Sequence, residues 1–523
     1  MKKPAIPFPW RGSLPAVLMT AGAVLLYAVV IWGSFLRIPL DSDYASLVLE
    51  ASDILSGNIL LSGWDLTGIS FLTTDLLYFI LATALLGVSP YAFYLAGTLM
   101  FLALMTGAFL LVRGKSGRET ACNTLLLVAL AGLPATSAVL LLRAHTGAFV
   151  WLFLGMWCVS RILADEHTAM RRYAFVAVLC ALGVIGDMIS LLVFGLPVVI
   201  VCIRKLFSAG TRKSRAYLGI GAAAVLGTAV GFLMDKLYFF IGGANKNQVI
   251  SFDHFAGWEG IWKNAGDYIQ GLLRLAGADF LEQPLFSLET VGYAVRTVLL
   301  IAGLVVVVSN VVRCIRDPEA PAVDSILSMG FVLLSAAFLV TTVSQGAYSM
   351  RYMSYASVLF AVLLIRRGQQ KGVFERAAAG GRWKVRQIVL VLSCLLIVAF
   401  LRVPPASYTP QLQDTLGEAL RQEGLSNGYA GFWSAPHTGV VTNGEVSVRG
   451  IRYMQGELRP YRWFSKDDWY DVPAHFIVTD PVDTFSISKQ NVEELLGPPD
   501  RTLVVNKYTV MIYDRDISGE LAR

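Results

Sequence analysis

The sequence predicts an α-helical polytopic membrane protein with about 11 transmembrane helices, interfacial helices on the outer face and a small C-terminal α/β extracytoplasmic domain. Of the 523 residues, 55% are hydrophobic and 15% are charged, against roughly 45–50% and 25% in soluble domains. Apolar runs of about 20 residues, long enough for a hydrocarbon core of ~30 Å, recur between residues 14 and 402 and then stop. We therefore expect a transmembrane domain over 1–404 and a C-terminal domain over 405–523.

The first apolar run, residues 14–36, follows Lys2, Lys3 and Arg11 and has the basic start of a signal peptide. It is longer than a typical signal-peptide core, and no pair of small residues that would mark cleavage follows before Asp41. We expect it to remain as the first helix. The six cysteines lie in apolar runs or beside basic loops, which indicates neither a disulfide framework nor a paired-cysteine metal site.

Basic residues cluster between the apolar runs, at residues 2–11, 113–118, 161–172, 204–215, 313–316 and 366–386. Such clusters favour the cytoplasmic side of a membrane, so the net charge of +6 does not indicate nucleic acid as a partner. If all six are cytoplasmic, two crossings separate each neighbouring pair. The predicted crossings are then 14–36, 92–112, 120–142, 146–160, 173–186, 189–203, 217–241, 291–312, 326–343, 352–365 and 388–403.

This map places the N-terminus in the cytoplasm and the tail on the other side of a bacterial-type inner membrane. If the remaining apolar segment 72–88 crossed the membrane, three crossings would separate the first two basic clusters, so we expect it to form an interfacial helix in the first outer loop, residues 37–91.

In the tail, the pattern predicts helices over 412–423 and 489–496. Strands are predicted over 428–433, 439–448, 475–478 and 503–513, with a turn at Asn506 and Lys507.

The first outer loop opens with two aspartates, Asp41 and Asp43, and continues with a helical stripe of Tyr44, Leu47, Val48, Ala51 and Leu55. Glu50 falls on the opposite, polar side of this amphipathic helix, which is predicted to lie along the membrane surface. In one interpretation, Asp41 caps the helix and the other acids face water. In the other, the acids carry chemistry. Residue spacing alone does not decide between the two.

An acidic pair directly after the first transmembrane helix, followed by surface helices and then by a helix ending in the basic turn Arg113-Gly114-Lys115, resembles the GT-C glycosyltransferases. This group includes the protein O-mannosyltransferases and the bacterial aminoarabinose and related lipid-sugar transferases. The resemblance implies transfer of a sugar from a polyprenyl-phosphate donor to an envelope glycan, lipid or protein. It also implies that Asp41 or Asp43 is the catalytic carboxylate that accepts the acceptor's proton. Members of the group commonly carry an Asp-Glu pair, so the roles of the two aspartates stay open.

The leaving polyprenyl phosphate is an anion and requires a cation on the outer face. Arg351, followed by Tyr352, resembles the Arg-Tyr pair of similar transferases, and an arginine can hold a phosphate through two hydrogen bonds. The alternative is an interfacial arginine that reaches toward the headgroups. Arg143 and His145 lie at another outer turn and are candidates for the phosphate or sugar, or for a plain helix end. Asp187 and Glu50 are candidates for lining the site.

A divalent cation is an open question, because the sequence shows no set of metal ligands at a recognisable spacing. A transporter or flippase of envelope precursors is the main alternative function, since many helices with few buried charges also describe those proteins. Transporters usually show two similar halves, which this sequence lacks. A non-catalytic scaffold for envelope assembly is a third alternative.

Overall fold

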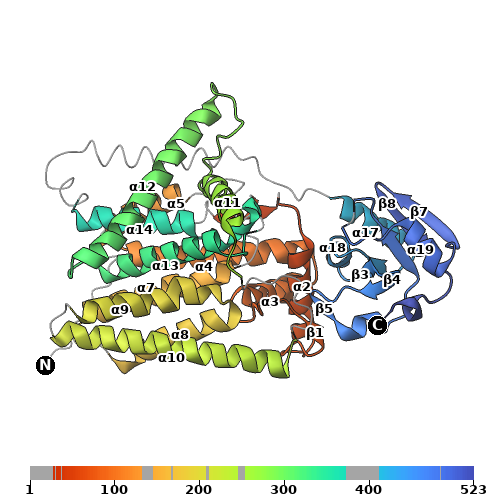
Figure 1. Cartoon of the computed structure of the whole chain (residues 1–523), viewed down its shortest axis with the longest axis horizontal. Helices are drawn as coiled ribbons and strands as arrows, with labels where there is room; N and C mark the ends of the chain where they lie inside the picture. Colours follow the sequence, from red (N-terminus) through yellow and green to blue (C-terminus); the bar gives the residue numbers. More distant parts are fainter. Residues whose placement is uncertain are drawn as a thin grey trace. The chain divides into compact units, whose positions relative to one another are not determined.

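The computed structural model describes residues 28–372 and 411–522, with gaps at 30, 34, 37, 132–144, 166–168, 208–210, 245–253, 345 and 483. The chain divides into two compact units (Figure 1). The helical unit comprises Met1–Phe35, Met100–Phe232 and Phe252–Ala406. The loop–tail unit comprises Leu36–Leu99, Leu233–Ser251 and Ser407–Arg523. The first outer loop and the tail, which are far apart in the sequence, thus fold together.

Five helices in the described part of the chain are long and apolar enough to cross a membrane. They are α4 (Pro90–Val112), α7 (Thr146–Ala164), α10 (Thr211–Ile241), α12 (Leu288–Arg316) and α13 (Ala322–Val340). Shorter helices are α5 (Gly117–Leu130), α8 (Met170–Gly186), α9 (Leu196–Leu206), α11 (Trp258–Ala276) and α14 (Ala356–Gln370). All of these except α11 overlap a predicted crossing. The five described helices that are long and apolar enough to cross a membrane are fewer than the predicted 11 transmembrane helices. The predicted crossing 388–403 lies outside the described residues.

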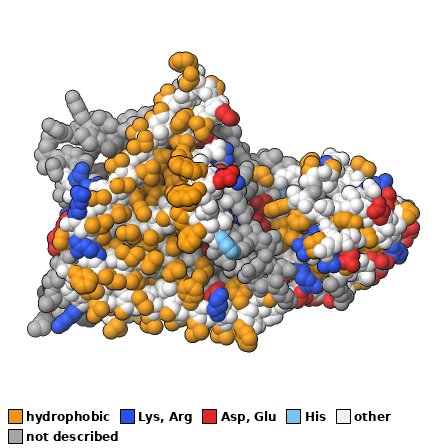
Figure 2. All heavy atoms as spheres, in the orientation of Figure 1, with side chains coloured by type: hydrophobic (Ala, Val, Ile, Leu, Met, Phe, Trp, Pro, Cys, Tyr) orange, Lys and Arg blue, Asp and Glu red, His pale blue; other side chains and the backbone are white. Residues whose placement is uncertain are grey.

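Two of the long helices face outward from the helical unit and expose apolar side chains. Only 28% of the apolar stretch of α10 and of α12 is buried, against 61% for α4 and α7. Figure 2 shows hydrophobic side chains gathered over this face of the molecule. The exposed residues on α12 include Val291, Val298, Ile301, Val305 and Val308. An apolar surface this extensive is not stable in water, so it indicates contact with lipid.

Polar contacts join the ends of several helices at one end of the helical unit. Arg204 donates to the carbonyl of Ile315 over 2.7 Å, and Arg366 donates to the carbonyl of Leu111 over 2.9 Å. Arg366 also pairs with Asp324 at the start of α13. These contacts bring Arg204, the end of α12 and Arg366, which belong to three of the basic clusters, to the same end as the basic turn after α4. The arrangement agrees with the expectation that these clusters share one side of the membrane.

The first outer loop contains two helices, α2 (Ser42–Leu55) and α3 (Asp75–Leu86), and the two-residue strand β1 (Trp64–Asp65). Helix α3 occupies the leftover apolar segment 72–88, as the sequence predicts. Tyr94 at the start of α4 donates its hydroxyl proton to the carbonyl of Ile38 over 2.7 Å. This bond fixes the beginning of the loop against the helix that ends it.

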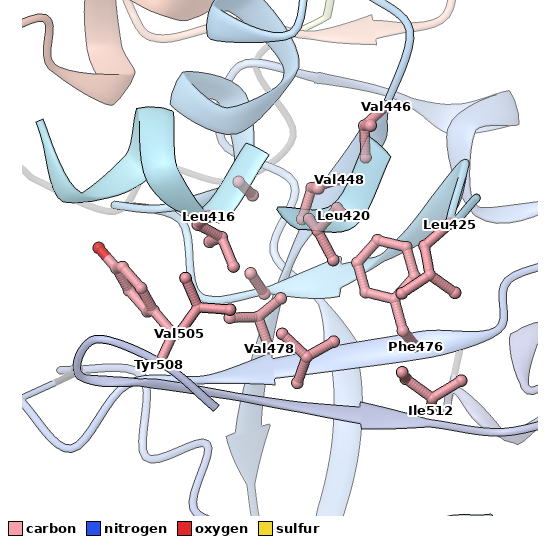
Figure 3. Packing of buried hydrophobic residues seen from close by; sticks show 13 residues of the cluster. Leu416, Leu420, Leu425, Val446, Val448, Phe476, Val478, Val505, Tyr508 and Ile512 are labelled. Atoms are coloured by element: carbon pink, nitrogen blue, oxygen red, sulfur yellow. The ribbon is translucent and has the colours of Figure 1, made fainter. Parts of the chain in front are cut away.

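The tail is built on a six-stranded mixed sheet with the strand order β4-β3-β2-β6-β8-β7. Its strands are β2 (Asn427–Ala430), β3 (Ser447–Met454), β4 (Glu457–Pro460), β6 (Phe476–Thr479), β7 (Arg501–Val505) and β8 (Tyr508–Ile512). Helices α17 (Leu412–Gln422), α18 (Ala435–Val441) and α19 (Lys489–Leu496) accompany the sheet. One core cluster packs α17 against the sheet through Leu416, Leu420, Val448, Phe476, Val478 and Ile512 (Figure 3).

The predicted strand over 439–448 is wrong in its first part, where the chain forms helix α18 instead. Pro436 stands in the first turn of α18, where its missing N–H costs no hydrogen bond. The β-branched residues that suggest a strand are buried by α17 and β3, and such packing overrides local propensity. The short strands β4 and β5 (Ser465–Lys466) are absent from the prediction, because neither shows an alternating pattern of useful length.

Candidate active site

Asp41 and Asp43 stand together at the beginning of α2. Asp41 is the N-cap residue of the helix, and its Oδ1 accepts the backbone N–H of Asp43 over 3.0 Å. Asp43 lies in the first turn, where the positive end of the helix dipole favours a negative charge. The capping role that the sequence suggests for Asp41 is therefore real, and it does not exclude a second, chemical role. Both aspartates are partly exposed.

The polar side of α2 does not face water along its whole length. Ser46 and Glu50 are both 0% exposed, because α2 packs against α3 and α18. In the part of the chain that the structure describes, neither carboxylate oxygen of Glu50 has a hydrogen-bond partner. Burial raises the pKa of Glu50 well above its ordinary value of 4.5. The interpretation in which all the acids of this helix face water is thus wrong for Glu50.

The tail contacts the polar side of α2 near both ends of the helix. Near the N-terminus, the indole Nε1 of Trp463 donates to Oδ1 of Asp43 over 3.4 Å. Near the C-terminus, Lys466 pairs with Asp53 at 3.3 Å, and Asp53 also accepts the indole N–H of Trp64 over 2.7 Å. The aspartates of the loop therefore bind side chains that lie more than 400 residues away in the sequence.

Backbone pairing reinforces these side-chain contacts. Strand β1 of the loop pairs antiparallel with strand β5 of the tail, with Trp64 opposite Lys466. The fully buried Trp64 packs edge-on against Trp469, with ring centroids 4.8 Å apart. Trp469 is thus part of the contact between loop and tail, whereas Tyr470 stacks on Tyr429 inside the tail.

A second group of predicted site residues gathers in the helical unit. His145 Nδ1 lies 2.6 Å from Oδ2 of Asp187, and both side chains are buried. The imidazole packs against the ring of Tyr352, with centroids 4.6 Å apart. The guanidinium of Arg351 lies 5.3 Å from the centroid of the same tyrosine ring. The structure therefore brings His145, Asp187, Arg351 and Tyr352 together, although no sequence pattern pairs the first two.

The local backbone explains how the histidine and the aspartate meet. His145 is the N-cap residue of α7 and has a left-handed φ of 72°, a conformation that is uncommon for non-glycine residues but that histidine adopts more often than most. Asp187 is the C-cap residue of α8, and its second oxygen accepts the backbone N–H of Ile189 over 3.0 Å. A carboxylate held in this way fixes the orientation of the imidazole. Arg143, the remaining candidate at this turn, lies outside the described residues.

This group stands at the end of the helical unit opposite the basic clusters. Helix α7 begins at His145 and carries Arg161 in its last turn. Helix α14 likewise follows Tyr352 and carries Arg367 in its last turn. An imidazole and a guanidinium that share an aromatic ring at one helix end form a surface suited to an anion such as a phosphate.

Two features of the structure are not predicted from the sequence. Arg296 lines an apolar cavity between α5, α11, α12 and α14; a lone arginine inside an apolar run is the signal that would have singled it out. Trp463 and Tyr461 approach Asp43, and no local pattern could have placed them there. Among the residues that the structure describes, no group of three or more His, Cys, Asp or Glu side chains is placed to hold a metal ion.

The fold is similar to that of a GT-C membrane glycosyltransferase, in agreement with the resemblance drawn from the acidic loop. Two solved structures of ArnT, an aminoarabinose transferase, from Cupriavidus metallidurans are similar to this chain. The apo structure has a TM-score of 0.54 at 12% identity and covers 97% of this chain and 99% of that one. The structure bound to undecaprenyl phosphate has a TM-score of 0.55 at 13% identity and covers 94% and 97%. No protein-family model and no curated protein sequence matches the chain.

Proposed function

We propose that the protein is a GT-C glycosyltransferase that moves a sugar from a polyprenyl-phosphate donor to an acceptor on the outer face of the bacterial cytoplasmic membrane. The observation that supports this most is the aspartate pair at the start of α2 in a chain whose fold is similar to ArnT over nearly its whole length. The similar structure holds undecaprenyl phosphate, which supports a polyprenyl-phosphate carrier as the donor lipid here.

In the proposed reaction, a carboxylate of the first outer loop accepts the proton of the acceptor hydroxyl. The hydroxyl oxygen then forms a bond to the anomeric carbon of the donor sugar, while the bond between that carbon and the phosphate oxygen breaks. The electron pair of the broken bond leaves with the polyprenyl phosphate. We assign the proton transfer to Asp41, because it directly follows the first apolar segment and so lies nearest the membrane boundary. Asp43 is the second candidate.

The leaving phosphate gains negative charge in this step and needs a cation. We assign that role to Arg351, assisted by the imidazole of His145, which Asp187 orients. An arginine that binds the phosphate more tightly as its charge develops lowers the barrier rather than merely holding the donor. Arg296, which lines an apolar cavity between four helices, is a further candidate for donor binding.

The pair of substitutions Asp41→Asn and Asp43→Asn tests the proposed base. Asparagine still accepts a hydrogen bond at the helix start, so loss of the carboxylate should cost at most about 1 kcal/mol of stability at the cap. An amide cannot accept the acceptor's proton, and general-base catalysis typically contributes 10²–10⁴-fold. We expect Asp41→Asn to slow the release of polyprenyl phosphate from extracted lipid-linked sugars by roughly that factor, as measured by mass spectrometry.

Asp43→Asn serves as the matched comparison and should cause a smaller loss. Activity retained in Asp41→Asn but abolished in Asp43→Asn would move the base to Asp43. Activity retained in both variants would reject the catalytic role of this loop.

A further inference from the structure

The segment Tyr461–Lys466 of the tail forms one wall beside the proposed catalytic aspartates; we call these residues 461–466 the tail wall. Trp463 contacts Asp43 through its indole N–H at 3.4 Å. Tyr461 lies close enough to Asp43 that the carboxylate contributes to a raised pKa of its phenol, after the larger effect of burial. Tyr461 and Trp463 are only partly buried.

The backbone of the tail wall is held in a conformation that the sequence does not favour. Phe464 has a φ of 50°, which is a genuine outlier for a bulky residue. Its side chain is buried, with 5% exposed, and the two residues that follow it pair with β1 of the loop. Strain of this kind persists only where the surroundings enforce it, and it is typical of functional sites. The turn at Phe464 lies between Trp463, which contacts Asp43, and strand β5, which pairs with β1.

The remaining neighbours of the tail wall support and extend its aromatic surface. The ring of Tyr461 packs against the ring of Phe485, with centroids 4.7 Å apart, and against that of Phe432, with centroids 5.5 Å apart. The guanidinium of Arg452 lies 5.8 Å from the Tyr461 ring. Within the described residues, the Nε of Arg452 has no hydrogen-bond partner. The tail wall thus combines two aromatic rings, one of them joined to Asp43 through its indole N–H, with a phenol and a guanidinium behind it.

We propose that the tail wall binds the acceptor and that the acceptor is a carbohydrate. This inference rests on the proposed function, because it takes Asp41 and Asp43 as the place where the acceptor hydroxyl reacts. A sugar ring has C–H groups on its flat faces, which pack on an aromatic ring, and hydroxyls at its edge, which bind N–H donors and carboxylates. A lipid chain would not use the polar groups.

The experiment is saturation-transfer NMR on the purified full-length protein in nanodiscs. The probe is the oligosaccharide mixture that mild acid releases from the envelope of the host strain. Wild type should saturate ring protons of a subset of these glycans. Trp463→Ala should weaken their binding roughly tenfold, a typical loss for an aromatic anchor, and Trp463→Phe should recover part of it because a ring face remains. Trp258→Ala is the matched control, since that tryptophan is 81% exposed in the other unit.

Three outcomes would overturn the proposal: no saturation of any glycan by wild type, unchanged binding in Trp463→Ala, or an equal loss in Trp258→Ala. The test separates this inference from the proposed function, because Asp41→Asn should bind the glycans while failing to transfer sugar. If Trp463→Ala binds glycans normally and Asp41→Asn is inactive, the proposed function stands and the acceptor lies elsewhere. If Asp41→Asn transfers sugar at the wild-type rate, the proposed function fails whatever the glycans do.

Discussion

At the scale of single residues, the proposed role of Arg351 depends on its being an arginine rather than a lysine. Its guanidinium presents a planar fork of donors to a phosphate, whereas lysine offers a point charge. We expect Arg351→Ala to raise the donor KM or lower kcat/KM by roughly 30-fold or more, the cost of removing one partner of a charged pair. Arg351→Lys should fall between Ala and wild type. The measurement is the donor dependence of polyprenyl phosphate release.

The control for this substitution is Arg274→Ala on α11. Arg274 is engaged with Asp279 at 3.1 Å and has no proposed role in donor binding. If Arg351→Ala and Arg274→Ala behave alike, Arg351 is an interfacial anchor and the donor phosphate is held elsewhere.

Glu50 gives the molecule a distinctive dependence on pH. Burial raises its pKa in the folded state, so the folded protein holds a proton that the unfolded chain releases near its ordinary pKa of 4.5. The stability from that proton is complete below this pH. It is lost as the pH rises toward the raised folded pKa, at about 1.4 kcal/mol for each pH unit between the two pKa values. Glu50→Gln mimics the neutral acid and should flatten this decline.

Thermal melting of the two proteins between about pH 4 and pH 8 measures the effect. We expect the advantage of Glu50→Gln over wild type to grow with pH. Glu418→Gln on the exposed side of α17 is the control and should not change the slope. A wild-type melting temperature that rises across this range, in parallel with that of Glu50→Gln, would show that Glu50 is ionised in the folded protein.

Several residue roles can be read from the sequence and several cannot. Asp41 and Asp43 can be singled out because they form an acidic pair soon after an apolar run. Arg351 can be singled out because it is a cation at a predicted outer turn between apolar runs. The pairing of His145 with Asp187 depends on how α7 and α8 meet, 42 residues apart, and no local pattern encodes such a contact. The contact of Trp463 with Asp43 is more distant still.

At the scale of elements, long apolar stretches predict helices reliably, whereas short apolar segments do not distinguish a helix from a strand. The helices α4, α10 and α12 are predicted with ends that differ by at most six residues from those observed, because an apolar stretch of that length is unambiguous. The hairpin of β7 and β8 is predicted because Asn506, with a φ of 53°, occupies the turn that its residue type favours. Helix α18 resembles a strand in sequence because its β-branched residues are buried by neighbours rather than by a sheet partner.

The pairing of β1 with β5 is a contact that joins the loop to the tail, beside the packing of α2 against α18. Lys466 and Asp53 are each 21% exposed in their side chains, so their ion pair is partly shielded from water. We expect Lys466→Ala to lower the free energy of unfolding by roughly 1 kcal/mol and to expose residues 461–466 to protease. Mass spectrometry of the first cleavage products, together with thermal melting, measures both effects.

Lys489→Ala is the matched control, because Lys489 and Glu493 form an ion pair on the exposed face of α19. Removing it should change stability by no more than about 0.5 kcal/mol and leave cleavage in the tail wall unchanged. In the double variant Asp53→Asn, Lys466→Ala, the two effects should be less than additive. Fully additive losses would mean that the pair does not link the loop to the tail.

At the scale of the whole molecule, the sequence separates a membrane part from a tail, whereas the structure groups the first outer loop with the tail. Composition predicts the division between membrane part and tail because each helix that faces lipid needs a long run of apolar residues. It cannot predict the grouping of the loop with the tail, since the contacts through Trp64, Asp53 and Asp43 join segments with different compositions. The grouping gives the tail a role in the chemistry that we propose, rather than that of an appended domain.

The most direct test of that chemistry compares masses before and after the protein acts. Wild-type protein and Asp41→Asn are reconstituted in liposomes with lipid-linked sugars and acid-released envelope glycans, and all products are analysed by mass spectrometry. For wild type, we predict free polyprenyl phosphate together with a glycan heavier by one sugar residue, and for Asp41→Asn, neither product. If the lipid-linked sugar instead moves from one leaflet to the other with its mass unchanged, the protein is a flippase and the transferase account is contradicted.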